Sequence, residues 1–392
     1  MKCILMNKNT EILKAELDTN NNFTKIYEVY NISLAPLSIY NSYHNKAQSE
    51  LKSLNAWYKG RGIPSWRKDV ENLLKKLQVK SCEELLNKAY SLSLSDQYWL
   101  KEEENIDLTW KSINFFTNDF EYKGYLQASL GSSSNIKNIS LASPNNTTDG
   151  MLTKAWVIEN EKRVLVKSTY TFSRQEPINE WLASRIGSLL NLDYVEYKID
   201  VLEGKLVSIC ENFLTEDEEI ISASDIFNSE KKSNNENDFE HYIKILNKKG
   251  ILDARKRMQD MYLVDYIMMN TDRHMKNYGI IRNVETGTWL KTTPIFDTGQ
   301  SLNCDKYISE LNFKNENCKF FYSETTTFED LLKYINLSNY DIEKLKSIIP
   351  ELKEKLLKYQ NIIEMSDVRI EKLIKGFESR INHLQKLKEE IS

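Results

Sequence analysis

Two aspartates and an asparagine lie in polar segments that follow apolar runs. Asp272 and Asn277 are five positions apart in the segment 270–279, which follows the apolar stretch 258–269. Asp297 follows a second, strand-like run. Carboxylate and amide oxygens are the ligands that Mg²⁺ takes in proteins, and a carboxylate also orients or accepts the proton of an attacking hydroxyl. These residue types therefore suit phosphoryl transfer.

The same chemistry needs a cation that reaches the phosphates. Lys167 ends the β-rich run 163–167, which forms a predicted hairpin with residues 154–158. Protein kinases carry such a lysine in a small sheet, and their catalytic loop places an Asn five residues after its Asp. An isolated Asp-x-x-x-x-Asn pattern often occurs by chance. The combination with Lys167 and with Asp297 near Gly299 is a strong indication of phosphoryl transfer.

The elements that must position these groups fall into a strand-rich part and a helical part. Pro177 marks the first turn of a predicted helix. Its apolar face has helical spacing: Ile178, Leu182, Ile186 and Leu189. Strands at 195–202 and 206–210 follow, and beyond about residue 214 the pattern is mostly helical apart from a hairpin-like stretch at 278–291. This order predicts an α+β fold with a small sheet lobe and a larger helical lobe.

Residues before about 140 form a separate, mixed region. Periodicity predicts a helix over 67–77, and Ser81–Glu84 is a capping box that opens a second helix. Two such helices are compatible with a DNA-binding helix-turn-helix, but a helical hairpin packed on its neighbours is favoured. The region is rich in aromatic residues, which are typical of a core and less often of a docking surface: Trp57, Trp66, Trp99, Trp110, Phe115, Phe116 and Phe120.

Composition excludes several classes of protein. The chain has 392 residues, with 53 Lys and Arg against 57 Asp and Glu and a net charge of −4. Its length predicts two or three domains, and its balanced charge argues against general disorder and against a generally basic nucleic-acid binder. No run of about 18 apolar residues predicts a transmembrane helix, and the first residues do not resemble a signal peptide.

The cysteines predict neither a disulfide framework nor a Cys-based zinc site, because no Cys-x-x-Cys pair occurs. They are scattered along the chain: Cys3, Cys82, Cys210, Cys304 and Cys318. We therefore expect a cytoplasmic protein.

The segment Asn-Thr-Asp-Arg-His-Met-Lys-Asn at 270–277 and the segment Pro-Ile-Phe-Asp at 294–297 carry a family resemblance. The chain resembles the HipA-like Ser/Thr protein kinases, which include bacterial toxin kinases and the related cell-translocating kinase, over about residues 140–392. The resemblance implies a protein-kinase-like bilobed fold. It also implies that Asp272 is the catalytic base, with His274 fixing the catalytic loop, and that Asn277 and Asp297 bind Mg²⁺.

The resemblance extends to the expected ATP site. Gly150 and Lys154 keep the spacing of the family's phosphate loop, and Lys167 is expected to hold the phosphates with Glu180 as its ion-pair partner. The segment from Glu211 to Phe213 resembles the hinge whose backbone binds adenine. The family's autophosphorylated serine, which switches the kinase off, corresponds to a candidate in this chain: Thr147, with Thr148 and Ser143 as competitors.

These inferences predict three parts: an N-terminal regulatory region at 1–140, a kinase N-lobe at 141–213 and a helical C-lobe at 214–392. The expected activity is transfer of the ATP γ-phosphate to a protein Ser or Thr hydroxyl. Expected partners are a protein substrate and a small helix-turn-helix antitoxin, with no membrane and no direct nucleic-acid contact.

Other interpretations stay open. The tripeptide Asp-Arg-His also occurs in the corresponding loop of phosphoinositide kinases, although this sequence shows no lipid-binding basic stretch. A nucleotide-binding, non-catalytic scaffold for a DNA-binding partner is a further alternative. Asp297-Thr-Gly is also the aspartic-protease signature, but no second copy occurs to complete a carboxylate dyad. The C-terminal apolar stripe from Leu373 to Leu384 is expected to pack on the helical lobe rather than to form a coiled-coil dimer.

Overall fold

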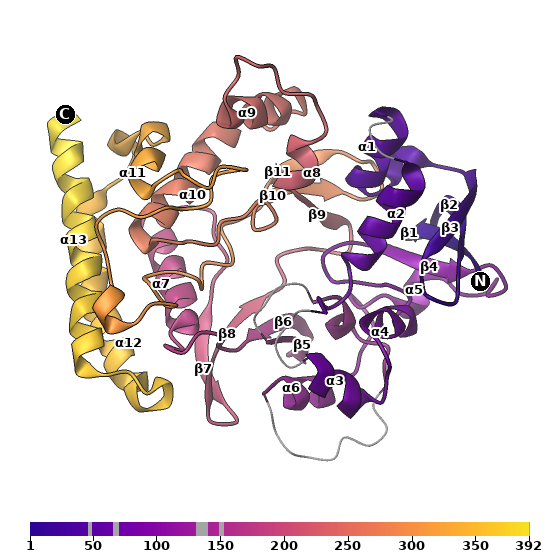
Figure 1. Cartoon of the computed structure of the whole chain (residues 1–392), viewed down its shortest axis with the longest axis horizontal. Helices are drawn as coiled ribbons and strands as arrows, with labels where there is room; N and C mark the ends of the chain where they lie inside the picture. The colour runs from indigo at the N-terminus through magenta and orange to yellow at the C-terminus, as the bar shows by residue number, and fades with distance from the viewer. Residues whose placement is uncertain (46–48, 66–69, 131–139, 149–152, 392) are drawn as a thin grey trace.

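The computed structural model describes residues 1–45, 49–65, 70–130, 140–148 and 153–391. Figure 1 shows an N-terminal region at one side of the molecule, a small strand-rich lobe beside it and a helical lobe that extends to the opposite side. The two ends of the chain lie on these opposite sides.

The N-terminal region is built on a four-stranded antiparallel sheet in the order β3-β2-β1-β4. Its strands are β1 (Lys2–Asn7), β2 (Thr10–Leu17), β3 (Phe23–Val29) and β4 (Tyr98–Glu102). Its helices are α1 (Leu37–Asn45), α2 (Glu50–Lys59), α3 (Val70–Leu77), α4 (Cys82–Lys88), α5 (Trp110–Ile113) and α6 (Lys123–Leu130). Leu54 and Tyr58 of α2 are buried in a core with the apolar side chains of the strands.

Local signals in this region are partly confirmed. The Ser81 side chain accepts a hydrogen bond from the Glu84 N–H at 3.2 Å, as a helix N-cap does. The Glu84 carboxylate accepts from the Lys80 N–H at 2.9 Å and not from Ser81, so only half of the expected capping box forms. Helices α3 and α4 contribute side chains to one buried cluster, together with Tyr125 of α6. Trp99, Trp110, Phe115 and Phe120 are buried, whereas Trp66 lies outside the described residues.

The strand-rich lobe has the expected order of strand, strand, helix, strand and strand. Its elements are β5 (Lys154–Glu159), β6 (Lys162–Lys167), α7 (Glu176–Leu189), β7 (Lys198–Leu202) and β8 (Lys205–Glu211). The sheet order is β5-β6-β8-β7, all antiparallel. Pro177 lies in the first turn of α7, where its missing N–H breaks no helical hydrogen bond. Ile178, Leu182 and Ile186 bury one face of that helix.

The helical lobe confirms the α+β class. Its helices are α8 (Ala223–Phe227), α9 (Asp238–Lys248), α10 (Ala254–Met268), α11 (Phe328–Leu331), α12 (Ile348–Ile363) and α13 (Asp367–Ile391). Its strands are β9 (Glu218–Ser222), β10 (Gly279–Asn283) and β11 (Trp289–Thr292), in the order β11-β10-β9. The sequence pattern did not predict β9. A Cβ atom at Gly279 would lie 1.9 Å from the Ile221 carbonyl oxygen, so this pairing requires glycine.

Helix α13 packs on the helical lobe, as expected. Leu373, Phe377, Ile381 and Leu384 are at most 1% exposed and belong to the main hydrophobic core. The stripe is therefore used within the chain, and α12 and α13 form the end of the molecule opposite the N-terminal region (Figure 1). Among the described residues, no helix is both long enough and apolar enough to cross a bilayer.

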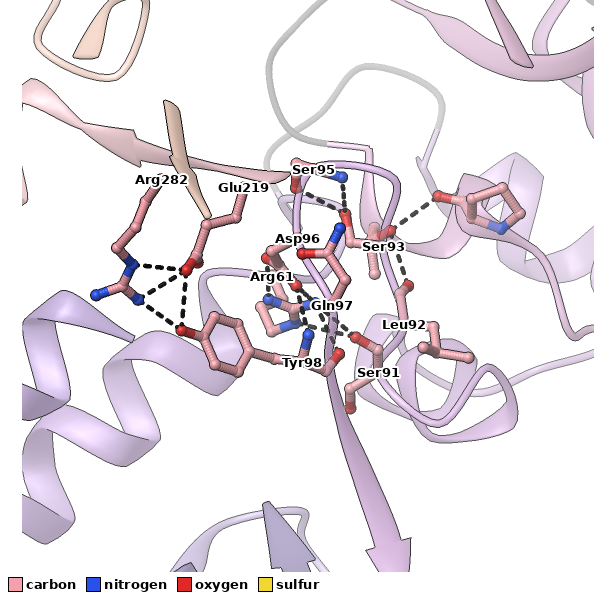
Figure 2. A network of polar contacts seen from close by, with 12 residues as sticks. Arg61, Ser91, Leu92, Ser93, Ser95, Asp96, Gln97, Tyr98, Glu219 and Arg282 are labelled. Atoms are coloured by element: carbon pink, nitrogen blue, oxygen red, sulfur yellow. Dashed lines mark hydrogen bonds and ion pairs between the residues drawn. The ribbon is translucent and has the colours of Figure 1, made fainter. Parts of the chain in front are cut away.

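Buried polar groups join the N-terminal region to the helical lobe (Figure 2). Arg282 of β10 donates from Nε to Glu219 of β9 at 2.8 Å and from Nη2 to the Tyr98 hydroxyl of β4 at 2.8 Å. All three residues are at most 4% exposed. Burial favours a neutral Glu219 and raises its pKa, while the Arg282 guanidinium opposes that shift. These hydrogen bonds join β4 of the N-terminal region to β9 and β10 of the helical lobe.

A second group in Figure 2 holds the loop that precedes β4. The Arg61 guanidinium donates to both carboxylate oxygens of Asp96, at 2.6 and 2.8 Å, and to the Ser91 carbonyl oxygen at 2.8 and 3.0 Å. The same loop accepts a hydrogen bond at Leu94 from the Asn212 side chain at 3.0 Å. Asn212 follows β8, so the N-terminal region contacts the connection between the two lobes.

Candidate active site

The loop that carries Asp272 and Asn277 follows the buried helix α10. Met269 ends that helix in the left-handed conformation, with φ of 50°. The loop is then closed by its own hydrogen bonds: the Asn277 N–H donates to the His274 carbonyl at 2.8 Å, and the Asn277 side chain donates to the Asp272 carbonyl at 3.0 Å. Asp272 and Asn277 are therefore fixed next to each other.

Arg273 anchors this loop to the core. Its guanidinium, 2% exposed, donates to both carboxylate oxygens of Asp265 on α10, each at 2.9 Å. The same group donates to the carbonyls of Asn277 at 2.9 Å and Phe296 at 2.7 Å. Because Phe296 precedes Asp297, one arginine ties the two polar segments together.

Asp297 lies beyond β11 in a strained backbone position, with φ of 55°. Its N–H donates to the Tyr197 hydroxyl at 3.2 Å. The following turn is held against α7, because the Asn179 side chain donates to the Gly299 carbonyl at 2.8 Å. A Cβ atom at Gly299 would lie 3.3 Å from Cβ of Glu176, so the close approach of this turn to α7 favours glycine.

Lys167, at the end of β6, lies between two carboxylates. Its Nζ is 2.6 Å from Oδ1 of Asp297 and also forms an ion pair with Glu180 of α7. Lys167 and Glu180 are 3% and 1% exposed, and the other Glu180 oxygen accepts a hydrogen bond from the Ser208 hydroxyl. The structure thus brings together the expected pair and adds Asp297 to it.

The charges of this cluster hold one another in place. Burial opposes the Lys167 ammonium, but the carboxylates of Asp297 and Glu180 outweigh it and raise the lysine pKa. Burial would likewise raise the pKa of Asp297, but Lys167 and Lys154 reverse this and hold it well below its ordinary range. Lys154 lies directly opposite Lys167 in the β5–β6 pairing. The cluster therefore contains a charged lysine and a charged Asp297 at neutral pH.

Of the residues expected around adenine, one packs beside the segment of Asp297 and another has an exposed side chain. Phe213 packs against Phe296 with ring centroids 5.8 Å apart, in an apolar group beside Tyr197. The Glu211 carboxylate is 54% exposed and pairs with Lys162 at 2.7 Å. Phe213 is thus brought next to the segment that carries Asp297, whereas the Glu211 side chain is not. Gly150 of the expected phosphate loop lies outside the described residues.

The three hydroxyls expected as autophosphorylation candidates are bonded to backbone carbonyls. Ser143 caps a short 3₁₀ helix, Pro144–Thr147, and donates to the Glu121 carbonyl at 2.8 Å. Thr148 donates to the Asn145 carbonyl at 3.1 Å, and both of these side chains are buried. Thr147 is half-buried and donates to the Pro144 carbonyl at 2.9 Å. Thr147 is the most accessible of the three.

The carboxylate of Asp272 faces two basic side chains. Oδ1 forms an ion pair with Lys319, and Oδ2 lies 3.9 Å from Nε2 of His274. His274 Nδ1 accepts a hydrogen bond from the Lys276 N–H at 3.3 Å, so the imidazole also braces the loop. Burial lowers the pKa of His274, with a smaller opposing effect from Asp272. His274 is therefore neutral at pH 7.

Sequence reasoning missed several residues of this site. It named Arg273 only as part of a pattern and did not find Asp265, Ser208, Tyr197 or Lys319. The sequence does give a reason to expect Asp265 in a polar cluster, because a carboxylate inside an apolar helix needs a charged partner. It gives no such reason for Lys319, because no residue near Lys319 in the sequence links it to Asp272.

Comparison with known proteins places the chain in a family. A family model described as the HipA-like C-terminal domain matches residues 147–359, which is more than half of the chain. No similar protein was found among curated proteins.

The chain is similar to several solved structures, two of which are compared with it here. A Helicobacter pylori proinflammatory kinase, CtkA, is 20% identical, with 61% of this chain and 94% of that chain covered and a TM-score of 0.45. The HipA of Shewanella oneidensis MR-1, solved as a toxin–antitoxin complex with HipB and operator DNA, is 12% identical, with 99% of each chain covered and a TM-score of 0.50. The likeness to HipA shows the expected protein-kinase-like fold. On the family match, the chain belongs to the proteins with a HipA-like C-terminal domain.

Proposed function

We propose that this chain is an ATP-dependent Ser/Thr protein kinase of the HipA type. One observation carries the proposal: Lys167 pairs with both Glu180 and Asp297, and Arg273 ties the Asp297 segment to the loop of Asp272 and Asn277. An ion pair that only stabilises the fold has no need of the loop of Asp272 and Asn277 beside it. Phosphoryl transfer requires both the lysine that holds the phosphates and the loop that orients the hydroxyl.

In the proposed reaction, Asp272 orients a substrate Ser or Thr hydroxyl and accepts its proton. The hydroxyl oxygen forms a bond to the γ-phosphorus, and the bond from that phosphorus to the β–γ bridging oxygen breaks, with the electron pair leaving on ADP. Lys167 neutralises charge on the phosphates, and its pairing with Glu180 holds it in position. Catalysis is then mostly positioning and charge stabilisation.

The residues of the site fit a magnesium ion. The Asn277 side chain donates through its nitrogen, and no described residue donates to its oxygen, which is the atom that binds a hard cation. Asp297 is charged and its side chain is 28% exposed. Among the described residues, no cluster of three His, Cys, Asp or Glu residues forms a metal site of its own. Mg²⁺ held by one or two protein oxygens and by phosphates fits this arrangement and neutralises phosphate charge.

The apolar group around Phe213 and Phe296 suits an adenine ring beside the backbone that follows Glu211. We propose that Lys154 and Gly150 belong to the phosphate loop and that Thr147 is the autophosphorylated residue, with Thr148 and Ser143 as alternatives. We also propose a cytoplasmic location, a protein substrate and a small helix-turn-helix partner, in keeping with the HipB-bound relative. Residues 1–140, 141–213 and 214–392 are proposed as the regulatory region, the N-lobe and the C-lobe.

The test is incubation of the full chain with Mg²⁺ and ATP labelled in the γ-phosphate. Label transferred to protein Ser or Thr supports the proposal. ATP binding without any transfer favours the non-catalytic scaffold. Label transferred to phosphoinositide vesicles, with none on protein, favours the lipid kinase.

A further inference from the structure

We propose that Lys319 is a catalytic residue that binds the phosphoryl group during its transfer from ATP to the hydroxyl. The inference rests on the proposed kinase activity. It concerns a residue 22 positions beyond Asp297, outside both polar loops that the sequence pattern identified.

The geometry places Lys319 at the carboxylate that accepts the proton. Its Nζ forms an ion pair with Oδ1 of Asp272. The side chains of Lys319 and Asp272 are 48% and 36% exposed, so both are open to an incoming substrate. Lys167 occupies the other part of the site, where it is buried against Asp297 and Glu180.

The segment around Lys319 is anchored on both sides. Cys318 and Phe320 are 6% and 8% exposed and belong to the main core. The Cys318 N–H donates to the Thr326 carbonyl at 2.8 Å, and the Phe320 ring stacks on Tyr334 with centroids 5.0 Å apart. Successive side chains of an extended segment alternate in direction. Burying Cys318 and Phe320 therefore directs Lys319 outward, to Asp272.

The charges at the site give this lysine a task. The transferring phosphoryl group spreads negative charge over its equatorial oxygens, and it must pass close to Asp272, which is itself an anion. Arg273 cannot turn toward it, because its guanidinium is buried and bonded to Asp265 and two carbonyls. Lys319 offsets the charge of Asp272 and reaches the same space on a flexible side chain.

Two other readings predict different behaviour. An exposed ion pair commonly contributes little to stability or function, in which case removal of Lys319 changes nothing. A lysine that merely blocks Asp272 in the free protein is an inhibitor, in which case its removal speeds transfer. Of these three roles, binding of the phosphoryl group is the one that slows transfer when the lysine is lost and also weakens binding of a mimic of that group.

The experiment compares Lys319→Ala and Lys319→Arg with the wild type. The control is Lys314→Ala, which removes the same charge from an exposed side chain on the same segment, where only the backbone makes hydrogen bonds. Two quantities are measured: the rate of phosphoryl transfer at saturating ATP, and the affinity for ADP with and without aluminium fluoride, a mimic of the transferring group.

We expect Lys319→Ala to lower the rate about 10²-fold, as loss of one charge-stabilising donor does, and to weaken binding of ADP with aluminium fluoride by a similar factor. ADP alone should bind as it does to the wild type, Lys319→Arg should recover part of the loss, and Lys314→Ala should match the wild type. An unchanged or faster rate in Lys319→Ala, or an equal loss of ADP affinity with and without the fluoride, overturns the assignment. If the wild type transfers no phosphate, the proposed function fails and this inference with it; if the wild type is active and Lys319→Ala equals it, only this inference fails.

Discussion

Nζ of Lys167 lies 2.6 Å from Oδ1 of Asp297, a residue 130 positions later in the chain. This contact joins the last residue of β6 in the strand-rich lobe to the polar segment that follows β11 in the helical lobe. The same ammonium also forms an ion pair with Glu180 of α7. The contact therefore requires a charged Asp297.

That charge predicts a pH dependence of stability. The pKa of Asp297 in the folded protein lies below its ordinary value near 4, so its pairing stabilises the fold fully above about pH 4 and this contribution is lost as the pH falls through the lower, folded-state value. We expect Asp297→Asn to lower the free energy of unfolding by about 1–3 kcal/mol at pH 7. This difference from the wild type should become smaller below about pH 4. Urea unfolding of both proteins in metal-free buffer with EDTA measures this. If the difference in unfolding free energy between the two proteins is the same at pH 7 and at pH 2.5, the pairing of Asp297 with Lys167 is contradicted.

The contacts of Arg273 predict that lysine cannot replace arginine at this position without a loss of phosphoryl-transfer rate. Lysine cannot reproduce a guanidinium that bonds Asp265 through two nitrogens and also reaches the carbonyls of Asn277 and Phe296. We expect Arg273→Lys to lower the rate of phosphoryl transfer about 10–100-fold, because the loop and the Asp297 segment lose their shared anchor. The control is Arg255→Lys, at an exposed pair with Glu240. Equal rates for Arg273→Lys and the wild type would remove Arg273 from the positioning of the site.

The buried pair between Glu219 and Arg282 predicts a large effect on stability far from the chemistry. Removing one partner leaves a buried charge uncompensated, so Arg282→Met should cost about 3–5 kcal/mol in urea unfolding. Adding Glu219→Gln should recover part of that loss. Arg174→Ala, at an exposed pair with Glu364, should change stability by about 0.5 kcal/mol or less. A small cost for Arg282→Met would mean that the N-terminal region is not held by this pair.

The candidate phosphorylation sites differ in access. All three hydroxyls donate to backbone carbonyls, but Thr147 is half-buried, whereas Ser143 and Thr148 are buried. We expect mass spectrometry of the protein incubated with Mg²⁺ and ATP to find phosphate on Thr147 in preference to the other two. Phosphate on Ser143 alone would require the 3₁₀ helix that it caps to open, and would contradict this ranking.

Much of the fold was accessible to sequence reasoning because its signals are local. The hairpin that carries Lys167 consists of two β-rich runs joined by a short turn. Helix α7 is predicted by Pro177 in its first turn and by the helical spacing of its apolar residues. The loop of Asp272 follows a helix that is apolar enough to be recognised as buried. In each case the informative residues lie within a few positions of one another.

The parts that sequence reasoning missed depend on contacts between distant segments. Strand β9 is short, and its identity as a strand comes from pairing with β10, more than fifty positions later. Lys319 reaches Asp272 only because Cys318 and Phe320 are buried in the main core. The partners of such residues are set by tertiary packing, which no local pattern encodes.

The role of Asp272 as the proton acceptor is tested most sharply by Asp272→Asn. Its affinity for Mg²⁺-ATP by calorimetry and its rate of γ-phosphoryl transfer are compared with those of the wild type on the same preparations. Asparagine keeps the size of the side chain but cannot accept the hydroxyl proton. We expect an affinity within a few-fold of the wild type and a rate lower by about 10²–10⁴-fold. Phosphoryl transfer by Asp272→Asn at the wild-type rate would contradict a role of Asp272 as the proton acceptor.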